Sequence, residues 1–76
     1  MRTILDGELR RWEVFATTGE FGAPNPAKVA FRCVSDAGVR PRILLFRGDK
    51  SDAEQAVAEA PDGELLRMFD ASQSVS

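Results

Sequence analysis

The chain of 76 residues contains no histidine and no tyrosine. These absences remove the commonest general base, the commonest metal ligand and a phenolic acid. The sequence also has no D-x-[DN]-x-[DN]-G loop for calcium and no G-x-x-x-x-G-K-[ST] loop for phosphate. We therefore predict a protein that is not an enzyme and that has no cofactor and no metal site.

Cysteine is nearly absent as well, since Cys33 is the only one. No internal disulfide can form, and small secreted domains usually have several, so we expect a cytoplasmic protein. Cys33 alternates with Phe31 along an apolar strand pattern and has no histidine to activate it. We interpret it as a buried, inert thiol and keep a redox role as the alternative.

Long hydrophobic runs are missing too. The longest aliphatic and aromatic run covers residues 43–46, which is far shorter than a membrane span. Acidic residues follow the N-terminal residue within a few positions, so no signal peptide is predicted. A chain of this length has room for one domain with a small core. We expect a single small soluble domain over residues 1–76, without a membrane partner.

Basic residues are scarce in the second part of the chain. Residues 51–76 hold Arg67 alone against six acidic residues, a net charge of −5, whereas residues 1–50 hold nine basic and six acidic residues, a net charge of +3. At Ser51 the apolar period also changes from two, as in strands, to three or four, as in helices. The sequence therefore predicts a basic sheet over residues 1–50 and an acidic helical part over residues 51–72.

The first two strands are predicted from a hairpin signal. Asp6-Gly7 favours a two-residue type I′ turn, since these residues tolerate positive φ. The flanking strands are expected over about residues 3–5 and 8–17. Alternation in the second strand predicts one face with Trp12, Val14 and Ala16, and a second face with Arg11, Glu13, Phe15 and Thr17.

Glycines and prolines between residues 18 and 27 predict a long loop, with Phe21 folded over the sheet edge. A third strand is expected over residues 28–34, and a turn follows over residues 35–38. A fourth strand is expected over residues 39–46. Because Pro41 has no N–H for the ladder, this strand is predicted either to lie at an edge or to begin its pairing after Pro41.

Two helices are predicted in the acidic part. Ser51 and Glu54 have the spacing of a capping box, so the first helix is expected to begin at Ser51 and to end near Ala60. Pro61 separates it from a second helix over about residues 62–72. The second helix is predicted to bury Leu65, Leu66, Met68 and Phe69. Residues 73–76 show no pattern and are expected to be a frayed tail.

These elements predict an α+β fold. We expect a four-stranded antiparallel meander, with an SH3-like open barrel as a variant, followed by two C-terminal helices that cover the Trp12/Phe31/Ile43 face. Trp12 is predicted to lie at the centre of the core, under the second helix.

Function is inferred mainly by eliminating catalytic chemistry. The leading hypothesis is a protein-interaction or accessory module that binds a protein partner or a second copy of itself, because the basic and acidic parts are separated. The alternative is a single-stranded nucleic-acid-binding domain, in which bases stack on an aromatic residue among cations. A third interpretation is a solvated sheet surface without a ligand. The candidate interaction surface consists of Arg11, Phe15, Lys28, Arg32, Arg40, Arg42 and Met68.

Overall fold

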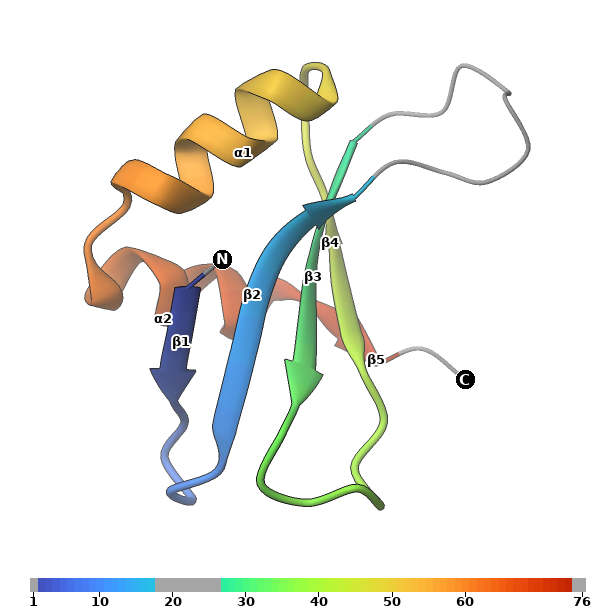
Figure 1. The fold of residues 1–76 in the computed structure, drawn as a ribbon, viewed down its shortest axis with the longest axis vertical. Coiled ribbons are helices and arrows are strands. Elements are labelled where there is room, and N and C mark those ends of the chain that lie inside the picture. Colours follow the sequence, from blue (N-terminus) through green and yellow to red (C-terminus); the bar gives the residue numbers. More distant parts are fainter. Residues whose placement is uncertain (1, 18–26, 75–76) are drawn as a thin grey trace.

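The computed structural model describes residues 2–17 and 27–74. In chain order the elements are β1 (Arg2–Leu5), β2 (Arg11–Thr17), β3 (Lys28–Cys33), β4 (Arg42–Leu45), α1 (Lys50–Glu59), α2 (Asp62–Ala71) and β5 (Gln73–Ser74) (Figure 1). The α+β class and the order of strands before helices are confirmed. The predicted long loop and the position of Phe21 fall outside the described residues.

The sheet has five antiparallel strands in the order β1-β2-β3-β4-β5. The prediction of four strands was therefore wrong by one. Gln73 and Ser74, which were expected to be part of a frayed tail, pair with Ile43 and Arg42 of β4. The preceding Ser72 is buried and has an extended backbone, so the chain leaves α2 directly as a strand.

The core lies between one face of the sheet and the two helices. Its fully enclosed large side chains are Trp12, Val14, Val29, Phe31 and Leu65. In Figure 1, α2 crosses behind the sheet and α1 lies across its upper end. Trp12 is buried as predicted, and its ring centroid is 4.8 Å from that of Phe69 in α2. We call this side of the sheet the helix face and the opposite side the open face.

Strand β4 has its two faces exchanged relative to the prediction. Arg42 pairs with Phe31, which pairs with Val14, so Arg42 lies on the helix face. Ile43 pairs with Ala30 and lies on the open face. The prediction that the helices cover Trp12 and Phe31 is confirmed, and the prediction that they cover Ile43 is wrong. Side chains alternate with a period of two, so a shift of one position moves every side chain of a strand to the other face.

The hairpin between β1 and β2 has a longer turn than predicted. β2 begins at Arg11, and the Asp6 N–H donates to the Arg10 carbonyl, so five residues join the strands. Leu9 takes the left-handed conformation at φ 64°. The Asp6 carboxylate accepts the N–H groups of Glu8 and Arg10, and these bonds hold the wider turn. Asp6 therefore nucleates the turn, although not in the two-residue form.

Pro41 precedes the first paired residue of β4, as the second of the two alternatives predicted. Pairing with β3 begins at Arg42, so the missing N–H of Pro41 removes no bond from the ladder. The strand is not at an edge, because β5 lies on its other side.

Helix α1 begins earlier than predicted. Its N-cap is Asp49, whose side chain accepts the Asp52 N–H at 2.9 Å, while the Asp52 carboxylate accepts the Asp49 N–H. The capping box is therefore Asp49/Asp52, and the predicted Ser51/Glu54 box was wrong. Gly48 precedes the cap at φ 132°, a conformation that favours glycine. The turn at Gly48 brings the chain into the helix two residues sooner.

The cap can be tested by a pair of substitutions. Asp49→Ala is expected to lower the free energy of unfolding by about 0.5–2 kcal/mol, because it leaves the Asp52 N–H without its side-chain acceptor. Ser51→Ala is the control and is expected to change it by less than about 0.5 kcal/mol, since Ser51 is exposed inside the helix. Urea unfolding measures both. Equal losses would contradict the assignment of the cap.

Arg2 joins the end of α1 to the start of α2. Its Nη1 donates to the carbonyls of Val57 at 3.1 Å and Ala60 at 2.7 Å, and its Nη2 donates to Asp62 Oδ1 at 2.7 Å. Neither helix has a basic residue in its last turn. A cation from β1 thus takes the place of a local one at the negative end of the α1 dipole. The helical part is therefore bonded to the first strand as well as packed on the sheet.

Candidate functional site

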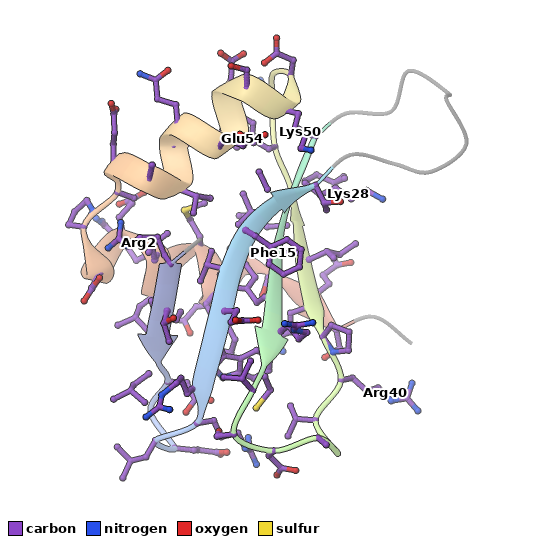
Figure 2. The ribbon with its side chains drawn as sticks, in the orientation of Figure 1. Arg2, Phe15, Lys28, Arg40, Lys50 and Glu54 are labelled. Carbon is purple, nitrogen blue, oxygen red and sulfur yellow. The ribbon has the colours of Figure 1, made fainter. Side chains whose placement is uncertain are left out.

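The open face is the side of the sheet opposite the core. Its residues fall in rows across the strands, set by the pairing register. Figure 2 shows Phe15 in front of the sheet and Lys28 near the upper end of β3. The open face comprises Thr3, Leu5, Arg11, Glu13, Phe15, Thr17, Lys28, Ala30, Arg32, Ile43, Leu45 and Gln73, with Val34 just after β3.

The centre of the open face is apolar. Phe15, Ala30 and Ile43 are register partners and form one row across β2, β3 and β4. Ala30 is only 8% exposed although it faces away from the helices, because the larger side chains on both sides shelter it. Leu45, in the next row, is 66% exposed. Apolar side chains of the open face are therefore exposed to solvent.

The lower end of the open face is also partly apolar. Leu5 is 53% exposed and Val34 is 44% exposed. Arg11 lies between them, because it pairs with Leu5 and its carbonyl accepts the Val34 N–H. Apolar side chains thus occur in three of the four rows. An exposed apolar surface of this kind, with polar groups among its members, is typical of an interaction site.

The charges of the open face are mostly positive. Arg32 forms an ion pair with its cross-strand neighbour Glu13 in the row next to Phe15. Arg11 and Lys28 lie in the two outermost rows, and neither side chain has a hydrogen bond or ion pair within residues 2–17 and 27–74. The face therefore has one neutralised pair near its centre and one uncompensated cation towards each end.

Arg42 was predicted to belong to this surface and does not. Its Nε donates to Ser72 Oγ at 2.8 Å, its Nη2 donates to the Ser72 carbonyl at 2.6 Å, and its guanidinium lies 5.0 Å from the centroid of the Phe69 ring. All three groups lie at the C-terminal end of α2 or just after it. Arg42 is a helix-capping residue on the helix face, which is the direct result of the exchanged faces of β4.

The other predicted surface residues are divided between locations. Arg11, Phe15, Lys28 and Arg32 share the open face, as the alternation in β2 and β3 predicted. Arg40 precedes β4, and in Figure 2 its side chain points away from the sheet, well below Phe15. Met68 is half-buried in α2 and packs against the core. Ile43 and Leu45 also lie on the open face and were not predicted there, because the faces of β4 were expected the other way round.

A second candidate site is a hollow at the lower end of the helix face. It has a volume of about 310 Å³ and is lined by the first hairpin, β4 and α2. In its wall, Trp12 Nε1 donates to Asp6 Oδ2 at 2.9 Å. Arg10 pairs with Glu8 and Arg42 binds Ser72, whereas Arg40 lines the hollow without an ion pair or hydrogen bond to the described residues. The apolar lining residues Trp12, Val39 and Phe69 belong to the core or pack against it. We therefore interpret this hollow as the outer end of the core.

Asp6 is the titratable group that this arrangement perturbs. Desolvation raises the pKa of Asp6. Hydrogen bonds from the Trp12 indole and from the N–H groups of Arg10 and Glu8, together with the charge of Arg10, lower this pKa by a larger amount. The net result is a pKa below the ordinary value of 3.8. A lowered native pKa stabilises the fold above the ordinary pKa, and this contribution is lost as the pH falls through the native value.

Asp6→Asn is expected to lower the free energy of unfolding by about 1–3 kcal/mol at neutral pH, because an amide offers one acceptor oxygen where the carboxylate uses two. Either the Trp12 indole N–H or the turn N–H groups then lose their acceptor. Urea unfolding as a function of pH measures the effect, and the variant is expected to lose less stability than the wild type below about pH 4. If the free energy of unfolding of the variant fell with decreasing pH as steeply as that of the wild type, the role given to Asp6 would be contradicted.

The described residues also bear on thiol, metal-binding and membrane chemistry. Cys33 is buried on the helix face, and its Sγ lies 3.8 Å from Ser35 Oγ. Within residues 2–17 and 27–74 there is no cluster of three or more acidic or cysteine side chains that could hold a metal ion. No helix in the same part of the chain is long and apolar enough to cross a membrane. Comparison with protein-family models, curated proteins and solved structures found no match.

Proposed function

We propose that the protein is a non-enzymatic protein-interaction module and that its docking surface is the open face of the sheet. The observation that carries this proposal is an apolar row of Phe15, Ala30 and Ile43, extended by exposed Leu45, on the face of the sheet opposite the core, where Phe15 also borders a hollow lined by α1. Removing this apolar surface from water would favour the binding of a partner by about 25 cal/mol per Å² buried. A cytoplasmic location, expected from the single cysteine, is part of the proposal.

A protein partner fits this surface better than a single nucleic-acid strand. Nucleic-acid affinity depends on how many phosphates the protein neutralises. On the open face only Arg11 and Lys28 are cations without an ion-pair partner among the described residues, and they lie in opposite outer rows. Phe15 is the one aromatic residue among the described members of the face, so stacking of successive bases has a single platform. An apolar protein surface complements the exposed apolar side chains of this face.

The proposal is tested by capture from the native host with two matched leucine variants. Leu45→Asp places a charge on the open face, and Leu9→Asp places the same charge on the hairpin turn, where Leu9 is 80% exposed. We expect a protein that the wild type and the Leu9→Asp variant both retain and that the Leu45→Asp variant retains at least about tenfold less. Equal retention by both variants would overturn the proposal.

The nucleic-acid alternative has its own measurement. Fluorescence anisotropy with a labelled single-stranded oligonucleotide at low salt is expected to show no binding at micromolar protein. Binding that disappears on Arg11→Glu and Lys28→Glu would replace the proposed function with the alternative.

A further inference from the structure

The open face has a property that points to one particular occupant. In the central row, large Phe15 of β2 stands beside small Ala30 of β3, and in the adjacent row, negative Glu13 of β2 stands beside positive Arg32 of β3. In these two rows the two strands therefore present opposite features. A surface of this kind is complementary to itself when a symmetry operation exchanges β2 and β3.

We propose that the partner on the open face is a second copy of this chain, packed sheet on sheet. The proposal rests on the proposed function, since it names the occupant of the same surface. The two-fold axis runs parallel to the strands, between β2 and β3. It keeps every row opposite the same row of the other copy and places β2 opposite β3. Sheets packed in this way lie about 10 Å apart, with their side chains interdigitated.

Shape complementarity comes from the central row. The axis places Phe15 of each copy opposite Ala30 of the other. Ala30 has a small side chain with Phe15 and Ile43 on either side, so the row is lowest at Ala30. Phe15 is partly exposed in the single chain and borders a hollow that α1 also lines, so its ring is accessible to a second copy. Two such contacts, related by the axis, would bury both phenylalanine rings.

Charge complementarity comes from the adjacent row. The same axis places Glu13 of one copy opposite Arg32 of the other, so each carboxylate lies between its own guanidinium and that of the second copy. Glu13 and Arg32 already form an ion pair within the chain. A two-fold axis perpendicular to the strands, through the Phe15 row, would instead place Arg32 opposite Lys28. Like charges opposed across an interface are unfavourable, so the axis parallel to the strands is preferred.

A head-to-tail contact between the open face and the acidic surface of α1 is also favourable in charge. Such a contact joins two different surfaces and continues into a ring or a filament instead of closing as a pair. The closed pair is therefore the simpler assembly for a small soluble chain. The open face is small compared with stable interfaces, which bury about 800 Å² per partner. We expect a weak dimer that forms with rising concentration.

The first test is sedimentation equilibrium of the full chain over a wide concentration range. The wild type is expected to approach twice its monomer mass of 8.3 kDa. Ala30→Gln fills the low point of the central row and is expected to remain monomeric, while Ala37→Gln in the exposed β3–β4 turn is expected to behave as the wild type. A wild type that is monomeric throughout, or that grows beyond a dimer, would overturn the proposal.

The decisive test uses two charge reversals that are mixed. Glu13→Arg and Arg32→Glu are each expected to be monomeric, because each places like charges opposite one another across the axis. In an equimolar mixture, the added arginine of one copy faces the added glutamate of the other, and the remaining Arg32 faces the remaining Glu13. The mixture is therefore expected to recover the dimer. Both variants must give the circular dichroism spectrum of the wild type, so that recovery cannot be attributed to refolding.

Failure of this inference is distinguishable from failure of the proposed function. Variants that do not recover a dimer on mixing overturn the two-fold geometry, whatever the wild type does alone. If a different protein is still captured by the wild type and lost by Leu45→Asp, the open face remains a docking surface with another occupant. If capture is also independent of Leu45, the proposed function itself is overturned.

Discussion

Leu65→Ala is expected to lower the free energy of unfolding by about 2–5 kcal/mol, the largest effect of any single truncation in the helical part. Leu65 is fully buried in α2 and belongs to the core cluster with Trp12, Val14 and Phe31. Each kcal/mol shifts the melting temperature of a domain of this size by about 4–8 °C, so a drop of about 8 °C or more is expected. Thermal unfolding followed by circular dichroism measures it.

The matched control for this prediction is Leu9→Ala. Leu9 is 80% exposed in the hairpin turn, so its truncation removes little buried area and is expected to change stability by less than about 0.5 kcal/mol. The contrast decides whether the acidic helical part is integral to the fold. A Leu65→Ala variant with an unchanged melting temperature would mean that α2 does not cover the sheet in solution.

Arg42→Met is expected to lower the free energy of unfolding by about 1.5–3 kcal/mol, because it removes charge-assisted hydrogen bonds at the end of α2. Methionine keeps the apolar stem that packs beside Phe69 and removes the donors that reach Ser72. The buried Ser72 region then loses a partner, and the pairing of β5 with β4 is weakened. Chemical unfolding measures the loss, and amide hydrogen exchange at Gln73 and Ser74 is expected to become faster.

Arg40→Met provides the control two positions away. Arg40 is exposed, and its side chain has no ion pair or hydrogen bond to the described part of the chain. The substitution removes the same charge and is expected to change stability by less than about 0.5 kcal/mol. Equal effects at the two positions would show that net charge, and not the capping of α2, determines the loss.

The difference between Arg40 and Arg42 also explains why the candidate surface could be predicted only in part. Strong alternation in β2 and β3 was enough to bring Arg11, Phe15, Lys28 and Arg32 to one face. In β4 and just after it, the residues Ile43, Leu44, Leu45 and Phe46 are all apolar, so the sequence contains no period of two that selects a face. Pairing with β3 makes the choice, because it aligns Arg42 with Phe31 and Ile43 with Ala30.

Sequence by itself determined the features that depend on neighbouring residues. The change of period at Ser51, the break at Pro61 and the inward position of Trp12 follow from local backbone preference and side-chain alternation. At Pro41 the same preferences left two alternatives, an edge strand or pairing that begins after Pro41. These preferences act within a few residues, so they can be read along the chain.

Only the tertiary structure decided the features that join distant segments. Arg2 binds the carbonyl groups at the end of α1, and Arg42 binds Ser72 after α2, over sequence separations that no local pattern reports. The same holds for β5, whose polar residues Gln73 and Ser74 have no strand pattern and are ordered by pairing with β4. The physical reason is that a free hydrogen-bonding group at a helix end or a strand edge can pair with any suitable partner. The packing of the core determines which side chain or strand lies within hydrogen-bonding distance of it.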